Sequence, residues 1–245
     1  SSGNKLAFSQ LKDARDRFSK LMDELKNGDP TVKLPASPAS MQPLLLEMEN
    51  TWLELSENAD GILKSQDAIV SVGEFIEVIN DTTPDVAGIF EEITDLLIKS
   101  EVSREQLFIA SKQLMLAQRI QNSVNNVLAG GELTAQALDQ FSIDSAQFQD
   151  VLTAMLDGDV NMGISRVDDE DLVALLTEAA ELFSSVNDYA EEIILLTPEL
   201  LPALEAAGLV SSSSDKVNNM ASKLLDAYGK SPGLWKIGNF QIGPG

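Results

Sequence analysis

The residues of this chain that could do chemistry are mainly carboxylates, because its 245 residues include no cysteine and no histidine. Their absence excludes thiol catalysis, disulfide bonds, zinc sites and histidine general bases. Adjacent acids such as Glu91 and Glu92 point in different directions from a helix, so they cannot act together on one glycosidic bond. No phosphate-binding loop, GxGxxG motif or GxSxG motif occurs. We therefore expect no enzyme and no cofactor.

The best candidate for a metal site is the stretch 157–161, where Asp, Asp and Asn alternate as at the start of a calcium loop. Met162 and Asp168 stand where that loop needs glycine and glutamate. The acids of 168–171 precede an apolar stretch, and acidic residues favour the positive end of a helix dipole. We interpret the first stretch as a solvated loop and the second as a helix start, and expect no bound metal.

Gln118 and Arg119 are the candidates for a ligand site. Arg119 stands out because Arg166 is the only basic residue between Ile120 and Asp215. The alternative interpretation is an ordinary surface or ion-paired arginine. The net charge of −22 repels nucleic acid and anionic membranes, so we expect no nucleic-acid partner.

Long helices must position these side chains, because apolar residues recur at i, i+3 and i+7 along most of the chain and no strand pattern occurs. Gly28 is expected to end the first helix, and Ser37-Pro38 to start the second. Thr-Pro pairs at 83–84 and 197–198 predict further helix starts. No 18-residue apolar run is expected to span a bilayer. Helices are predicted over about 11–25, 38–81, 84–100, 103–129, 133–157, 172–193 and 212–229.

An imperfect repeat relates residues about 130 positions apart. The stretch 13–29 matches 144–159, and Trp52 corresponds to Phe183. Repeats of this kind indicate a duplicated structural unit. We therefore predict an all-α fold of two stacked, imperfectly duplicated helical-bundle modules with long helices. The first module is expected over 5–115 and the second over 103–230, sharing a connecting helix. The stretch 231–245 is interpreted as an extended tail, for which an origin outside the native protein stays open.

Several stretches resemble the periplasmic region of type IV pilus methyl-accepting chemotaxis transducers, the PilJ-type family. The resemblance covers about 5–230, and the order and spacing of its short matches make it specific. The matching residues include Leu11–Arg15, Asn27–Asp29, Leu34-Pro35-x-Ser37-Pro38, Asn58–Asp60, Leu116–Ile120, Ser123–Gly130 and Glu178-x-Ala180–Phe183.

The resemblance implies a periplasmic sensing domain of an inner-membrane chemoreceptor whose membrane-spanning segments lie outside the given sequence. Such receptors form homodimers and signal to a cytoplasmic histidine kinase and an adaptor through a separate signalling domain. The family controls type IV pili, twitching motility and surface sensing, and contact with the pilin subunit is the expected stimulus.

Related modules in nitrate sensor kinases hold an anion between arginines at a dimer interface. Met115 and Arg119 match that motif, but Leu114 stands where its first arginine would be. The equivalent helix of the first module would precede residue 5, so the first module is expected to lack its first helix. The resemblance thus implies an incomplete anion clamp.

Two other functions stay open from the sequence. One is a chemoreceptor domain that binds a small solute between helices, and the other is a helical scaffold unrelated to signalling. A transmembrane helix in the full-length gene would exclude the scaffold.

Overall fold

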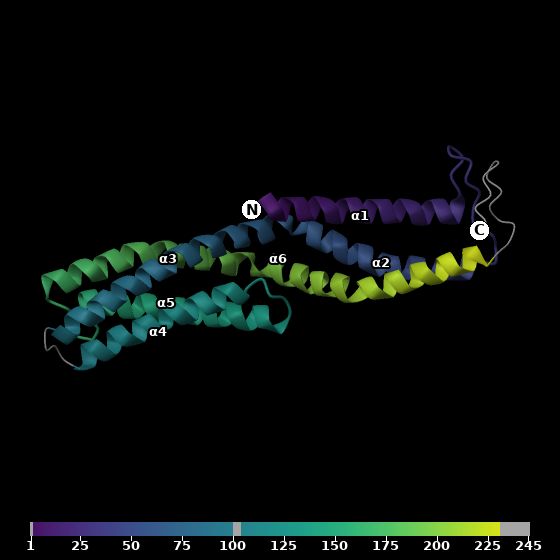
Figure 1. The fold of residues 1–245 in the computed structure, drawn as a ribbon. Coiled ribbons are helices and arrows are strands. Elements are labelled where there is room, and N and C mark those ends of the chain that lie inside the picture. The colour runs from purple at the N-terminus through teal and green to yellow at the C-terminus, as the bar shows by residue number, and fades with distance from the viewer. Residues whose placement is uncertain (1, 100–103, 231–245) are drawn as a thin grey trace. The chain divides into compact units, whose positions relative to one another are not determined.

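The structure is a computed structural model, and it describes residues 2–99 and 104–230. The six helices of these residues are drawn in Figure 1. The prediction of an all-α fold is confirmed for the part of the chain that the structure describes. The helices are α1 (Ser2–Asn27), α2 (Gln42–Lys64), α3 (Gln66–Lys99), α4 (Arg104–Asn126), α5 (Glu132–Asp157) and α6 (Glu170–Gly229).

Two helix boundaries differ from the sequence prediction at prolines. Helix α3 continues through Pro84, and α6 continues through Pro198 and Pro202, so the predicted starts at 83–84 and 197–198 are wrong. A proline inside a helix costs about 3 kcal/mol or more. The α3 face that includes Ile79, Val86 and Phe90 stays buried on both sides of Pro84, and burial of each such side chain contributes about 1.5–3 kcal/mol. Burial therefore outweighs the local penalty.

The predicted helix over 38–81 is also divided, because α2 ends at Lys64 and α3 begins at Gln66. Ser37 does not cap α2: its N-cap residue is Met41, which makes no side-chain cap hydrogen bond. The hydroxyl of Ser37 instead donates to the carbonyl of Leu25 at 2.5 Å. The residue before a proline disfavours helical dihedral angles. Here that residue, Ser37, links the loop to the end of α1 by its hydrogen bond.

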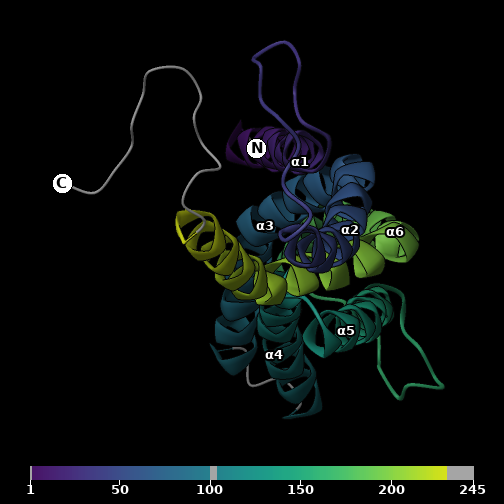
Figure 2. The same ribbon diagram turned by 90° about the vertical axis from the view of Figure 1, so that its right-hand side faces the viewer.

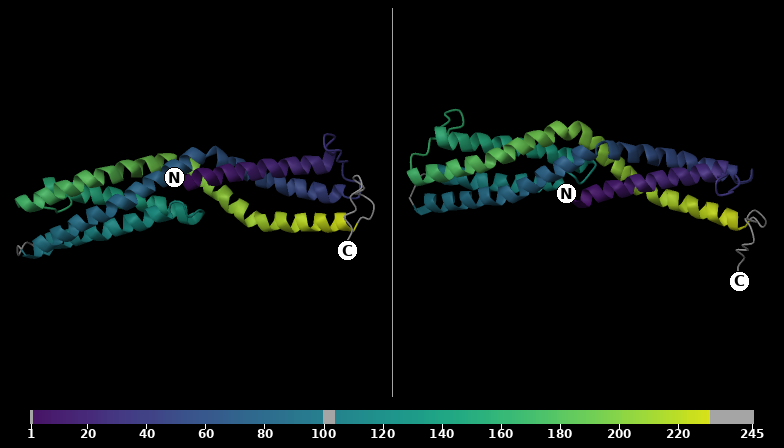
Figure 3. Two further views of the ribbon diagram at one scale, coloured as in Figure 1. Left: turned by 45° about the horizontal axis from the view of Figure 1, so that its top comes forward. Right: turned by 90° about the horizontal axis from the view of Figure 1, so that it is seen from above.

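The described chain divides into two compact units, and each is treated by itself. Unit 1 comprises residues 67–204, in which α3, α4, α5 and the first part of α6 run side by side (Figures 1 and 3). Its core is one cluster of buried side chains centred on aromatic residues. Phe148 contacts Phe90 edge to face at 5.4 Å between ring centroids, and it contacts Phe183 at 4.1 Å.

Unit 2 comprises residues 2–66 and 205–230, which form α1, α2 and the last part of α6. Figure 2 views these three helices nearly end on. They enclose a smaller core built largely from methionine, which fills irregular gaps in a core easily. Its buried members are Met22, Met41, Leu45, Met48, Met220 and Leu224.

These unit boundaries differ from the ranges 5–115 and 103–230 expected from the sequence. Residues 67–115 pack with the later helices because the apolar faces of α3 and α4 share one core with α5. The C-terminal part of α6 packs instead with α1 and α2. The stacking of the modules stays a prediction, and the tail 231–245 lies outside the described residues.

The sequence repeat has a close counterpart in the structure. In unit 2, the rings of Phe18 and Trp52 lie 4.1 Å apart at an interplanar angle of 33°. In unit 1, the rings of Phe148 and Phe183 also lie 4.1 Å apart at 33°. These two pairs occupy equivalent repeat positions, so the helix pairs α1–α2 and α5–α6 meet in the same way.

The loops after α1 and α5 also share one geometry. Asp29 and Leu34 exchange two backbone hydrogen bonds of 2.8 Å, and Asp159 and Ile164 exchange two of 2.8 and 2.9 Å. Within each loop the aspartate carboxylate accepts a backbone N–H two residues later. The hydroxyl and the backbone N–H of Thr31 hold the pKa of Asp29 below its usual value by stabilising the carboxylate.

A glycine opens each loop, and substituting the first one is expected to be the more destabilising. Gly28 has a φ of 78°, and a Cβ there would lie 2.6 Å from the Leu34 carbonyl oxygen. Gly158 has a φ of 83°, but its nearest contact would be the Arg166 nitrogen at 3.3 Å. Gly158 combines its positive φ with a ψ of 142°, a region that essentially only glycine adopts. Alanine at such a strained position costs about 1–3 kcal/mol, and the backbone clash adds to this cost in the first loop. Gly28→Ala should therefore lower the free energy of unfolding by about 3 kcal/mol or more.

The measurement is urea unfolding followed by circular dichroism, with Gly158→Ala as the matched control. That control should cost about 1–3 kcal/mol. Equal losses in the two variants would contradict the close packing assigned to the first loop.

Candidate functional site

Arg119, the basic residue singled out by sequence, lies on α4 and is already paired. Its Nη2 atom is 2.8 Å from Oδ1 of Asp144 on α5. The Asp144 side chain is fully buried, whereas that of Arg119 is 46% exposed. The guanidinium therefore neutralises a carboxylate inside unit 1. This geometry agrees with the alternative interpretation of Arg119 as an ion-paired arginine.

Gln118, the second candidate, is exposed on α4, and its amide donates to Gln121 on the same helix at 3.4 Å. Met115, which matches the anion-sensor motif, is also exposed. Neither Gln118 nor Arg119 lines either of the two cavities described below. The structure places the two candidates side by side on the exposed surface of α4.

Sequence reasoning missed a buried polar layer between α4 and α5. Gln113 is fully buried, and its amide donates to the backbone carbonyl of Phe148 at 2.8 Å. Gln140 donates to the Oδ1 atom of Asp144 at 2.9 Å. Three buried oxygen atoms in this region have no hydrogen-bond partner within the described residues: Gln113 Oε1, Asp144 Oδ2 and Ser145 Oγ. Such a layer is costly unless its groups are paired, so it favours one alignment of the two helices.

The available signal for this layer was the position of Asp144 in its helix. It lies three residues after Phe141 and four before Phe148, in the middle of an apolar stripe. A carboxylate there requires a partner on a facing helix, and no sequence pattern identifies which helix that is.

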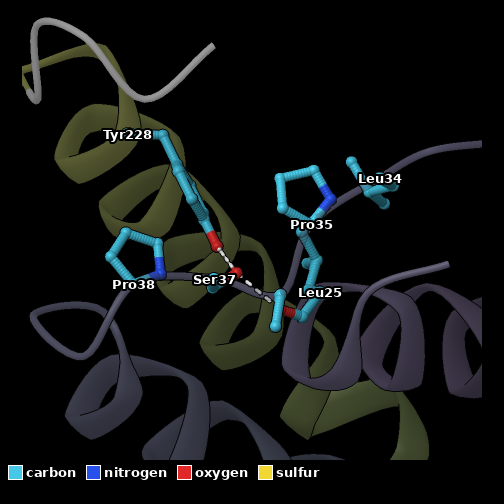
Figure 4. A pocket seen from close by; sticks show the side chains of 7 residues that line it. Leu25, Leu34, Pro35, Ser37, Pro38 and Tyr228 are labelled. Carbon is cyan, nitrogen blue, oxygen red and sulfur yellow. Dashed lines mark hydrogen bonds between the residues drawn. The ribbon is translucent and has the colours of Figure 1, made fainter. Parts of the chain in front are cut away.

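A small cavity in unit 2 lies where the first loop meets the end of α6 (Figure 4). Ser37 is at its centre, and its oxygen contacts both the Leu25 carbonyl and the hydroxyl of Tyr228. The cavity volume is about 130 Å³. Its walls are Leu25, Leu34, Pro35, Ala36, Ser37, Pro38 and Tyr228. The lining is mostly apolar, and both hydroxyl groups are already hydrogen-bonded to each other.

A wider, shallow groove of about 430 Å³ runs along α6 in unit 1. Its lining is acidic, with Asp188, Glu191 and Glu192 beside Tyr189. Across the ranges 2–99 and 104–230, no group of three or more acidic side chains is arranged to hold a metal ion.

The other acidic stretches have local structural roles. Asp159 accepts the backbone N–H groups of Asn161 and Met162 at 2.7 and 3.0 Å, which closes its own turn. Asp169 accepts those of Asp171 and Leu172 at 3.1 and 3.0 Å, so it caps α6 as predicted.

One helix of the described part is long and apolar enough to cross a membrane by length and composition alone. This is α6, in which 22% of the qualifying 18-residue stretch is buried. The expectation that no such stretch exists is therefore wrong. The prolines inside α6 led the sequence prediction to divide the helix, so the continuous stretch was overlooked.

The chain is similar to one family model and to known chemotaxis proteins. The family model described as "Type IV pili methyl-accepting chemotaxis transducer N-term" matches residues 2–76. Protein PilJ of Pseudomonas aeruginosa is 36% identical over 222 residues, which are 91% of this chain and 33% of that protein. The chain is therefore similar to PilJ-type transducers over most of its length. The resemblance noted from short sequence matches is thereby confirmed.

A second relative is similar over nearly the whole chain. The putative methyl-accepting chemotaxis protein AlkN of Alcanivorax borkumensis is 30% identical over 239 residues, which are 95% of this chain and 34% of that protein. The chain thus spans about a third of the length of these relatives. The similarity to these relatives extends far beyond residues 2–76 and covers residues of both units.

Proposed function

We propose that this chain is the periplasmic sensing region of a transmembrane chemoreceptor that controls type IV pili, twitching motility and surface sensing. The observation that carries the proposal is 36% identity to Protein PilJ over 91% of the chain. The bundled helices of both units support it, because packed helices transmit small shifts between two discrete arrangements. In this proposal the region catalyses no reaction.

The proposed stimulus is contact with the pilin subunit in the periplasm. Receptor homodimers would carry the signal across the membrane to a histidine kinase and an adaptor. The size of the first cavity and the one-sided lining of the second favour a protein contact over a small solute. The cavity around Ser37 holds about 130 Å³, whereas sites for small ligands usually occupy about 300–1,000 Å³. The wider acidic groove is lined by α6 alone, so it encloses no ligand between helices.

Direct binding to purified pilin tests the proposal. Immobilised pilin should retain the chain with saturable, reversible kinetics at physiological ionic strength. The chain carries a net charge of −22, so an unrelated helical protein of matched charge is the control for non-specific attraction. A pilin contact would be contradicted if the chain bound no more strongly than the control. It would also be contradicted if binding of both proteins disappeared alike at moderate salt concentration.

A further inference from the structure

Unit 2 concentrates oxidisable side chains in its core. Four of the seven methionines of the chain belong to its buried cluster, and each is only 4–7% exposed. Because the chain has no cysteine, a peroxide meets no thiol in it, and thioethers are the sulfur groups that it can oxidise. We call these four side chains the thioether core: Met22, Met41, Met48 and Met220.

The sequence repeat shows that the fold does not require methionine at these positions. The alignment set by the two ring pairs makes Leu152 of unit 1 the equivalent of Met22, and Leu172 the equivalent of Met41. Both leucines are buried. Leucine and methionine have similar volumes and replace each other in cores at little cost. Packing alone therefore does not explain why unit 2 has thioethers where unit 1 has leucine.

A peroxide converts a thioether into a sulfoxide by transferring one oxygen atom. The sulfur attacks one oxygen of hydrogen peroxide, and an S–O bond forms as the O–O bond breaks. The proton on the transferred oxygen passes to the departing oxygen, which leaves as water. The sulfur loses two electrons and the peroxide gains them. The flexible apolar side chain thereby becomes polar, which disrupts methionine-rich cores.

The core of unit 2 is poorly prepared for this new acceptor oxygen. Among the described residues, the buried side-chain oxygen atoms that lack a hydrogen-bond partner all belong to unit 1. Thr51, a buried hydroxyl of unit 2, already donates to the Glu47 carbonyl at 3.2 Å. A buried acceptor without a donor lowers stability, so each sulfoxide favours opening of the core.

The methionines of unit 1 are placed differently. Met115 and Met162 are exposed, so their sulfoxides stay hydrated and need no buried donor. Met155 is one buried side chain within a much larger core. Oxidation should therefore affect the two units unequally.

We propose that the thioether core is a modification site for two-electron oxidants of the peroxide class. Oxidation there loosens unit 2, which means that the backbone amides of α1 and α2 lose protection from hydrogen exchange, while unit 1 stays folded. The exposed methionines react first, because the thioether core reacts only through its small exposed fraction or through local opening. This proposal does not depend on the proposed pilin contact.

Hydrogen peroxide tests the proposal on the 245-residue chain. Peptide mass spectrometry measures the sulfoxide at each methionine, and hydrogen–deuterium exchange measures amide protection in each helix over the same time course. Oxidation of the thioether core should accelerate exchange in α1 and α2 by about tenfold or more, as expected for unpaired buried acceptors. Exchange in α4 and α5 should stay unchanged.

The matched control replaces all four methionines of the thioether core by leucine, the residue that unit 1 has at two of the equivalent positions. This variant keeps the apolar volume of the core and loses its thioethers. Its exchange in α1 and α2 should not respond to peroxide, although Met115 and Met162 are still oxidised. The time course of the unsubstituted chain gives the same decision without a variant, because exchange should accelerate only after sulfoxides appear in the thioether core.

Faster exchange in α1 and α2 that follows oxidation of the thioether core, and is missing from the leucine variant, supports the proposal. Equal acceleration in that variant overturns it, as does acceleration in the unsubstituted chain that coincides with oxidation of Met115 and Met162 alone. Complete oxidation of the thioether core with unchanged exchange also overturns it. So does a thioether core that stays unoxidised after both exposed methionines have been converted.

Discussion

Phe148→Ala is expected to lower the free energy of unfolding of unit 1 by about 3–5 kcal/mol, the usual range for truncating a buried phenylalanine. The Phe148 ring is fully buried and contacts both Phe90 and Phe183. Its removal deletes two aromatic contacts and leaves a cavity at the centre of the core. The close packing of four helical segments around this site limits how far the cavity can collapse.

The matched control is Phe18→Ala at the equivalent repeat position. The Phe18 ring contacts one other ring, that of Trp52, and the side chain is only half-buried. We expect a loss of about 1–2 kcal/mol for this variant, because less apolar surface is removed from contact. Urea unfolding of both variants, followed by circular dichroism, measures the difference. Losses of similar size would mean that burial at the two positions is alike, contrary to the structure.

Arg119→Met is expected to destabilise the chain by about 3 kcal/mol, at the lower end for breaking a buried ion pair because Arg119 itself is partly exposed. The variant leaves the Asp144 carboxylate inside the core with Gln140 as its one remaining hydrogen-bond partner among the described residues. The neighbouring substitution Gln118→Met is the control. It should change stability by less than about 0.5 kcal/mol, because Gln118 is exposed.

A double-mutant cycle separates the ion pair from packing at the same site. The double variant with Arg119→Met and Asp144→Leu removes both charges, so no carboxylate is left buried without a cation. It should therefore be more stable than the Arg119→Met variant alone, and the cycle should give a coupling energy of about 1 kcal/mol or more. Additive losses would show that the pair contributes no specific interaction.

Local signals predicted much of the fold correctly. The apolar stripe and the glycine after it placed the end of α1 at Gly28, and the acids before Leu172 predicted the cap that Asp169 makes. The repeat predicted that two helix pairs share one arrangement, and the ring pairs of Phe18 and Phe148 confirm it. These features depend on residues close together in sequence or on a comparison within the sequence.

The features that sequence reasoning missed depend on contacts between distant residues. Pro84 is a strong local signal for a helix start, but its effect is outweighed by the burial of the α3 face on both sides. Serine is a favoured helix-capping residue, but the Ser37 hydroxyl forms hydrogen bonds with the Leu25 carbonyl and the Tyr228 hydroxyl instead. The partner of Arg119 could not be identified, because Asp144 is 25 residues away on another helix.

The division of the chain into two units has a consequence for spectroscopy. The sequence contains two tryptophans, Trp52 and Trp235, and neither lies in residues 67–204. With Trp235 replaced by phenylalanine, intrinsic fluorescence reports only on the surroundings of Trp52, and therefore on unit 2. Far-ultraviolet ellipticity records the helices of both units. Any transition visible in ellipticity but silent in fluorescence would thus be assigned to unit 1 without the need for an added label.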